Sequence, residues 1–287
     1  MTDPRFACSE RSLGELGDRC AWAKRAGIDG VELCGAGDEL VARLPELERV
    51  RRAGLRISTV CTGPPFLGRA QPQTIDRAVD ELRSAIEVAA AIEADGVVLP
   101  VSMPPDPAAD APRTLPAYVV DALATVVEHA GGCGVGVFIE PLNRYEDGAV
   151  NRLEEAVRLC EVLAGDHVGI AADLFHMNIE EHDLAAAIHA AGSRLRHTHL
   201  ADSNRLPPGR GHLPLEPVLG ALRDIGFNGW LTFECTLPDP PDQSLGEAVA
   251  VVSEAWRAGA MPGAPCSPGW CDIAPSSLSS TPGTHYR

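Results

Sequence analysis

Short apolar segments return at intervals of roughly 30 residues along this chain, as βα units require, and no other feature of the sequence restricts its possible folds so strongly. The segments are rich in valine, isoleucine and leucine. Eight can be counted, at Arg5–Ser9, Gly30–Cys34, Arg56–Thr62, Gly96–Ser102, Val135–Leu142, Val168–Leu174, Arg196–Ala201 and Trp230–Cys235. Near-continuous apolar strands are typical of a parallel sheet covered by helices, and eight of them are enough to close a barrel.

The gaps between these segments carry helical patterns, in which apolar residues step by three and four along one face. Two such sets are Ile75, Val79, Leu82, Ile86 and Ala89, and Leu153, Val157, Cys160 and Ala164. Gly27, Gly54 and Gly226 stand shortly before strands, where glycine supplies the left-handed cap that ends a helix. We therefore predict an α/β protein with a (β/α)8 barrel over residues 1–258.

An open, doubly wound sheet uses the same elements, so the strand ends decide between the two folds. No GxGxxG or P-loop motif follows the first strand, and the later segments carry polar residues at their C-terminal ends. Polar side chains at that edge are typical of barrel active sites. Residues 259–287 are rich in proline, glycine and serine without an apolar period, and we predict a poorly ordered tail there.

Charge and cysteine usage narrow the classes of partner. With 40 acidic and 24 basic residues, the chain has a formal net charge of −16. This charge repels phosphate backbones and anionic lipids, so we expect neither nucleic acid nor a membrane as partner. The nine cysteines contain no CxxC pair. Because the first residues also lack the segments of a signal peptide, we expect a reduced, cytoplasmic protein.

Four consecutive strands end in residues that can meet at the mouth of a barrel. These strands read VFIEPLNRYED, GIAADLFHMNIEE, HTHLADSNRLPPGRGH and LTFEC, and they place Glu140, Asp173, His199 and Glu234 at their C-terminal ends. Three carboxylates and an imidazole suit Mn2+, Mg2+ or Co2+ better than structural zinc. Singly, each residue has a structural explanation, such as a helix cap for Asp173. Together they favour a cation, because buried unpaired carboxylates are costly.

Two further residues lie close to this set in the pattern. His197 stands two positions before His199 and points to the same side of the strand but deeper, so we predict a buried supporting residue rather than a fifth ligand. Glu32 ends the second strand, where it either enters the site from the far wall or forms a structural ion pair.

The stretches EPLNRYED, DLFHMNIEE, HTHLADSNRLPPGRGH and LTFE resemble the xylose-isomerase-like sugar isomerase/epimerase superfamily. The resemblance is greatest to the ketose 3-epimerase (D-tagatose 3-epimerase type) and hydroxypyruvate isomerase branches, and it extends to about residue 257. It implies a TIM barrel that forms a homodimer or homotetramer and holds one divalent ion, Mn2+ in the first place and otherwise Mg2+, Co2+ or Zn2+. By position, Glu140, Asp173, His199 and Glu234 would be its ligands.

The resemblance also implies roles in catalysis. Glu140 and Glu234 would be the two acid/base groups, while Glu146, His176 and Arg205 would contact substrate oxygens. A small ketose or sugar-like hydroxy-carbonyl compound would lose a proton to one carboxylate, pass through a cis-enediolate, and regain a proton on another face or carbon. Within this chemistry the sequence does not distinguish an isomerase from an epimerase. It also does not distinguish these two from a dehydratase or lyase that acts on keto-sugars or inososes.

Two readings from other classes have less support. A non-catalytic sugar-binding barrel would be expected to have lost a ligand, and all four positions hold competent residues. An abasic-site endonuclease would need further ligands and a positive face for DNA, against the net charge of −16. Substrate identity is left to the proline-containing loops around residues 64–72 and 104–116.

Overall fold

The computed structural model describes residues 3–17, 19–35, 37–62, 67, 71–101 and 114–258. Within them, eight parallel strands form a closed barrel in sequential order, with the last strand paired to the first. The strands are β1 (Arg5–Ser9), β2 (Gly30–Cys34), β3 (Arg56–Cys61), β4 (Gly96–Pro100), β5 (Gly136–Glu140), β6 (Val168–Asp173), β7 (Leu195–Leu200) and β8 (Trp230–Phe233). The predicted (β/α)8 TIM barrel is confirmed.

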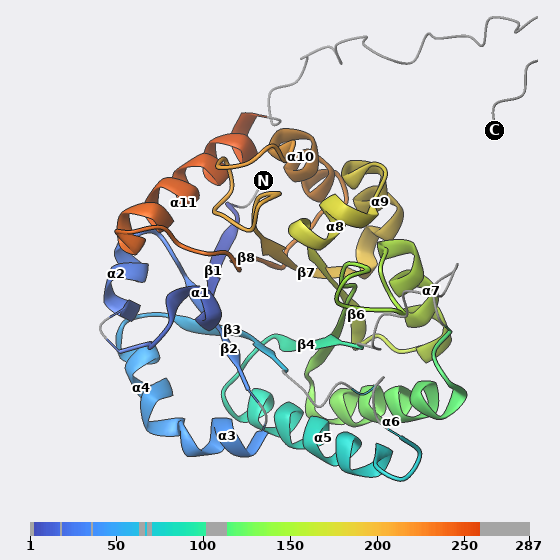
Figure 1. Ribbon diagram of the computed structural model, residues 1–287. Helices are drawn as coiled ribbons and strands as arrows, with labels where there is room; N and C mark the ends of the chain where they lie inside the picture. Colours follow the sequence, from blue (N-terminus) through green and yellow to red (C-terminus); the bar gives the residue numbers. More distant parts are fainter. Residues whose placement is uncertain are drawn as a thin grey trace, which may run out of the picture.

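Helices surround the strands as an outer ring (Figure 1). They are α1 (Glu10–Leu13), α2 (Arg19–Arg25), α3 (Gly37–Ala42), α4 (Leu44–Arg52), α5 (Ile75–Ala91), α6 (Ala117–Cys133), α7 (Leu153–Leu163), α8 (Leu174–Glu180), α9 (Leu184–Ala191), α10 (Leu215–Asp224) and α11 (Pro241–Ala258), with a 3-10 turn η2 (Gly192–Arg194). The ring closes where α11 contacts α2. The first and last parts of the barrel are therefore held together in both layers.

The sequence patterns explain these elements. The apolar faces predicted for α5 and α7 pack against the barrel, and α7 ends at Leu163 because Ala164 adopts a left-handed cap. Gly27, Gly54 and Gly226 have φ angles of 95°, 75° and 69°, the region in which glycine is favoured. The strands end within three residues of their predicted limits, so the strand-end residues lie at the mouth.

Other sequence expectations have mixed outcomes. The seven cysteines in the described part of the chain are all free. No helix among the described residues is both long and apolar enough to span a bilayer. Residues 259–287 and most of the loops around 64–72 and 104–116 lie outside the described residues. The division into a barrel at 1–258 and a tail therefore stays a prediction.

Candidate metal centre

The four predicted ligands converge at the C-terminal mouth of the barrel. Glu140, Asp173, His199 and Glu234 each place one nitrogen or carboxylate oxygen within 4.8 Å of the others, and all four are buried. Nδ1 of His199 lies 2.7 Å from Oε1 of Glu140, 3.5 Å from Oε2 of Glu234 and 3.8 Å from Oδ2 of Asp173. The imidazole thus faces three carboxylates that come from three different strands.

Asp173 serves two structural purposes with its two oxygens. Oδ1 accepts hydrogen bonds from the backbone nitrogens of Phe175 at 2.8 Å and His176 at 3.3 Å, and so caps α8. Oδ2 faces the centre instead. The helix-cap reading of this residue and the site reading are therefore both true, and the cap fixes the direction of the second oxygen.

The centre is short of positive charge. Burial raises the pKa of Glu234 to about 8, and the neighbouring Glu140 adds to the rise while His199 and Arg205 oppose it. Burial also opposes protonation of His199, but Glu32, Glu234 and Glu140 hold its pKa well above the usual range. Three carboxylates therefore crowd one imidazolium and one guanidinium. This hard, oxygen-rich donor set fits a divalent cation.

Behind His199 lies a second carboxylate contact, which orients the ring. Nε2 of His199 is 3.0 Å from Oε2 of Glu32, and Thr59 donates to the same oxygen at 2.8 Å. Although burial opposes it, His199 and His197 hold the pKa of Glu32 well below its usual range. An ionised Glu32 accepts the Nε2 proton and leaves Nδ1 to face the centre. Such outer carboxylates are common behind metal-binding histidines.

His197 is a buried neighbour of this pair, as predicted. Its Nε2 lies 3.1 Å from Oε2 of Glu32, and its ring stacks on Phe138. Burial lowers the pKa of His197, although Glu32 opposes the effect. Glu32, His197 and His199 form a second group of three possible cation ligands. Because His199 is shared, we interpret this group as support for the four-residue centre.

Arg205 reaches into the centre from the loop after β7. Its guanidinium donates to Oδ2 of Asp173 at 2.6 Å and to Oε2 of Glu234. It also lies over the ring of Phe175, 4.9 Å from the centroid. The backbone of Arg205 has a φ angle of 59°, an uncommon conformation for a residue with a Cβ. The structure thus places this predicted substrate contact against two of the four predicted ligands.

His176 and Glu146 lie beside the centre and are joined by Asn143. Nδ1 of His176 is 2.7 Å from Nδ2 of Asn143, which donates to Oε1 of Glu146 at 2.9 Å. Nδ1 of His176 is 4.0 Å from Oε1 of Glu146. On the other side of the ring, Nε2 of His176 is 3.8 Å from Oδ2 of Asp173. Asn143 was missed from the sequence, where a loop asparagine carries no distinctive signal.

A buried carboxylate organises the loop that carries Arg205. Asp202 accepts hydrogen bonds from the backbone nitrogens of Ser203, Gly209 and Leu213, at 2.7, 2.9 and 3.1 Å. Burial opposes ionisation, but these backbone donors lower the pKa of Asp202. A Cβ at Gly211 would approach Oδ1 of Asp202 to 2.1 Å. The loop therefore folds around one ionised side chain.

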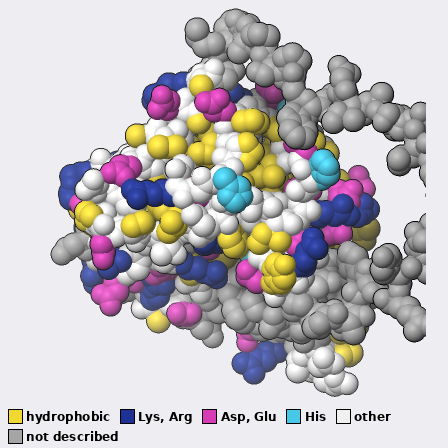
Figure 2. Space-filling view, turned by 45° about the horizontal axis from the view of Figure 1, so that its top comes forward, with side chains coloured by type: hydrophobic (Ala, Val, Ile, Leu, Met, Phe, Trp, Pro, Cys, Tyr) yellow, Lys and Arg dark blue, Asp and Glu magenta, His cyan; other side chains and the backbone are white. Residues whose placement is uncertain are grey.

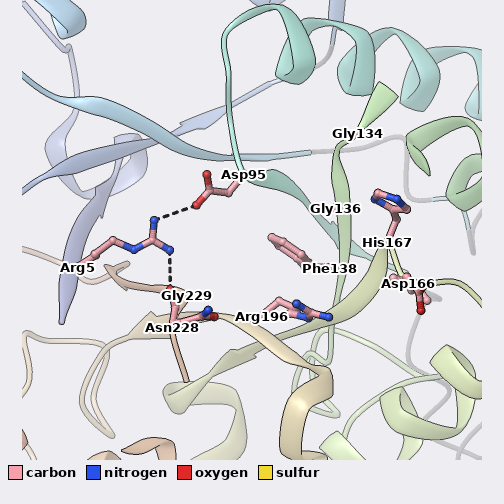
Figure 3. A pocket seen from close by; sticks show the side chains of 11 residues that line it. Arg5, Asp95, Gly134, Gly136, Phe138, Asp166, His167, Arg196, Asn228 and Gly229 are labelled. Atoms are coloured by element: carbon pink, nitrogen blue, oxygen red, sulfur yellow. Dashed lines mark hydrogen bonds and ion pairs between the residues drawn. The ribbon is translucent and has the colours of Figure 1, made fainter. Parts of the chain in front are cut away.

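A separate hollow of about 270 Å³ lies at the opposite, N-terminal end of the strands (Figure 3). Its polar lining includes Arg5, which donates to Asp95 at 3.3 Å and to the backbone oxygen of Asn228 at 2.6 Å. The seven predicted site residues do not line it. That end of a barrel contributes to stability rather than catalysis. On the face shown in Figure 2, charged side chains of both signs are interspersed.

Fold and site together define a class of protein, the (β/α)8 barrels with a candidate cation centre at the carboxyl ends of the strands. The sequence pattern of the xylose isomerase-like TIM barrel family matches residues 20–255. The chain belongs to this family.

Several proteins that are similar to this chain are sugar epimerases. The 3-dehydro-D-guloside 4-epimerase of Escherichia coli (strain K12) is 30% identical over 81% of this chain and 92% of its own length. The D-psicose 3-epimerase of Enterocloster bolteae is 44% identical over 49% of this chain and 45% of its own length, so that match spans about half of each. The crystal structure of an E. coli 3-keto-D-glucoside 4-epimerase in its apo form has a TM-score of 0.76 and 28% identity, and covers 88% of this chain and 100% of that one. The predicted family and the class of sugar isomerase or epimerase are confirmed.

Proposed function

We propose that the protein is a divalent-cation-dependent epimerase or isomerase of a small ketose or keto-sugar. The observation that carries the proposal is the set of three buried carboxylates and one imidazole within 4.8 Å at the barrel mouth. Glu140, Asp173, His199 and Glu234 would hold the ion, with Mn2+ as the first candidate. The names of the similar proteins support a sugar with a ketone as substrate.

Two carboxylates would move the protons. Glu140 ends β5 and Glu234 follows β8, so they approach the centre from strands that are not neighbours. One would remove a proton from the carbon next to the carbonyl, and the other would return one to a different face or carbon. The chemistry that a bound divalent ion supplies is polarisation of the carbonyl and stabilisation of the enediolate charge.

The remaining site residues would position the substrate. Arg205 is held against the centre by its contact with Phe175, and can donate to substrate oxygens in a fixed direction. His176 and Glu146, linked through Asn143, line the side of β5 and α8. Their hydrogen bonds would orient the chain of hydroxyls so that the reacting carbon lies between the two catalytic carboxylates.

Proton exchange in D2O tests this function. The Mn2+-loaded protein is incubated with ketoses, 3-keto-glycosides, hydroxypyruvate and inososes, and the products are followed by NMR. We expect deuterium next to the carbonyl, lost on chelation and reduced about 100- to 10,000-fold in Glu234→Gln. Glu247→Gln, an exposed carboxylate paired with Arg210, is the matched control. Release of water would indicate a dehydratase, and no exchange on the whole panel would refute the proposal.

The same proposal extends to assembly and location. We propose a homodimer or homotetramer, which light scattering after size-exclusion chromatography distinguishes from a monomer. We also propose a cytoplasmic location, which is supported by the seven free cysteines among the described residues. Fractionation of the source cells tests it.

A further inference from the structure

A second guanidinium stands at the mouth of the barrel and takes no part in the proposed proton transfers. Arg11 lies in α1, directly after β1, and its Nη1 is 3.6 Å from Oε1 of Glu234. The side chain of Arg11 is 52% exposed, whereas that of Glu234 is only 7% exposed. The guanidinium therefore lies between the buried carboxylate and solvent, on the side from which a substrate enters.

The backbone of Arg11 is fixed by its neighbours on both sides. Glu10 accepts a hydrogen bond from the backbone nitrogen of Cys34 at 3.0 Å, which ties α1 to the end of β2. Ser12 accepts one from the backbone nitrogen of Cys235 at 2.8 Å, which ties α1 to the chain after β8. Because both anchors hold, the short helix presents the side chain of Arg11 over the mouth.

The side chain itself keeps its donors available. Arg205 donates to two carboxylates of the centre. By contrast, the one ion pair of Arg11 within the described ranges is the 3.6 Å contact with Glu234. A charge-assisted hydrogen bond has a nitrogen–oxygen distance of about 2.7–2.9 Å, so the contact of Arg11 with Glu234 is longer than such a bond. A guanidinium carries five N–H groups in a planar fork, so Arg11 can donate two parallel hydrogen bonds to a ligand.

Charge at the mouth favours an uncharged ligand for these donors. Three carboxylates face the centre (Glu140, Asp173 and Glu234) and a fourth, Glu32, lies behind His199, against the guanidinium groups of Arg205 and Arg11. The carboxylates outnumber the guanidinium groups and the whole chain has a net charge of −16, so an anionic sugar is disfavoured here relative to a neutral one.

We propose that Arg11 is a specificity-determining residue, which hydrogen-bonds hydroxyl groups of a neutral sugar at the end away from the reacting carbon. The inference rests on the proposed function for the placement of the sugar between Glu140 and Glu234. Arg11 then selects among ketoses by the hydroxyls at their distal end. It does not hold the ion and does not move a proton.

Matched substrate pairs test the role of Arg11. D-psicose and 6-deoxy-D-psicose, D-ribulose and 5-deoxy-D-ribulose, and a methyl 3-keto-glucoside and its 6-deoxy form each differ in one distal hydroxyl. Affinity is measured by calorimetry on the Mn2+-loaded protein, and KM and kcat where turnover occurs. In Arg11→Met we expect the affinity for at least one complete sugar to fall about 10- to 100-fold, as for a hydrogen bond to a charged group.

The deoxy partner of that sugar should bind the variant and the wild type about equally, and Arg11→Lys should recover part of the loss. Arg210→Met removes an exposed arginine paired with Glu247 and should change neither. Loss of kcat at unchanged KM, equal effects on both members of every pair, or a changed Mn2+ affinity in Arg11→Met would overturn the inference. So would failure of the wild type to bind any of the sugars. Selective binding without proton exchange would support Arg11 and refute the proposed function.

Discussion

Replacing Glu32 with glutamine tests whether the carboxylate behind His199 prepares that ring to bind a cation. Oε2 of Glu32 lies 3.0 Å from Nε2 of His199 and 3.1 Å from Nε2 of His197, and the side chain is fully buried. Glutamine keeps the size of the side chain and one acceptor oxygen, but it removes the negative charge. It therefore weakens the contact that directs Nδ1 of His199 toward the other three proposed ligands.

The size of the effect follows from the burial of the pair. Loss of an outer hydrogen-bond partner costs about 10- to 100-fold in metal affinity, or about 1.4–2.7 kcal/mol. Neither Glu32 nor His199 is exposed to solvent, so water cannot replace the lost charge. We therefore expect Glu32→Gln to lie at the upper end of this range.

Calorimetric titration of the ion-free protein with MnCl2 measures this affinity directly, without a substrate. Glu180→Gln is the matched control, because the Glu180 side chain is only 5% exposed and pairs with Arg144 at 2.8 Å, outside the four-residue centre. Thermal unfolding of each variant establishes that it is folded. Wild-type Mn2+ affinity in Glu32→Gln, or an equal loss in Glu180→Gln, would refute the reasoning.

Three further predictions concern protons, thiols and the loop after β7. The pKa of Glu234 is raised from 4.5 to about 8, so this group stabilises the ion-free fold at low pH and the contribution is lost as the pH rises toward 8. Mn2+ binding requires the ionised form of Glu234, so the affinity for Mn2+ should rise with pH up to about 8. The rise should be at most about tenfold per pH unit for each proton released, and titrations at several pH values measure it. A hydrogen bond from Cys61 lowers the pKa of Cys34, although burial opposes the effect, and Cys34 is half-buried whereas Cys61 is buried. Iodoacetamide should therefore label Cys34 first among the described cysteines. Earlier labelling of Cys160, measured by peptide mass spectrometry, would contradict this. Gly211→Ala places a Cβ against Asp202 and should lower stability by about 1–3 kcal/mol, whereas Gly132→Ala, where a Cβ meets nothing within 4 Å, should not; urea unfolding compares the two.

The parts of the molecule that were predictable from sequence are those that depend on short-range patterns. Each strand is a local apolar run, and the position of its C-terminal end follows from the run to within a few residues. The sequence alone therefore assigns Glu140, Asp173, His199 and Glu234 to one mouth of the barrel. Their convergence follows from the parallel order of the strands.

The residues that sequence reasoning missed depend on contacts between distant segments. Arg11 lies in a helix of only four residues, too short to show an apolar period. Glu32 was named from the sequence with two alternatives, a site residue or a structural ion pair. Its partner His199 lies 167 positions further along the chain, and nothing near Glu32 in the sequence identifies that partner. Asn143 resembles any loop asparagine until His176 and Glu146 are seen on either side of it.

The pairing of β8 with β1 also sets the order of events when the chain is made. Glu234 follows β8, which joins β7 and β1 only when nearly all of the barrel has left the ribosome. Until then the nascent sheet has two open edges, and such edges favour association with other chains. Glu234 is the last of the four site residues to be synthesised, and it directly follows β8, the strand whose pairing removes both open edges. The proposed cation centre is therefore complete only in the finished ring, and tight binding of the ion is expected of the completed barrel and not of shorter folding intermediates.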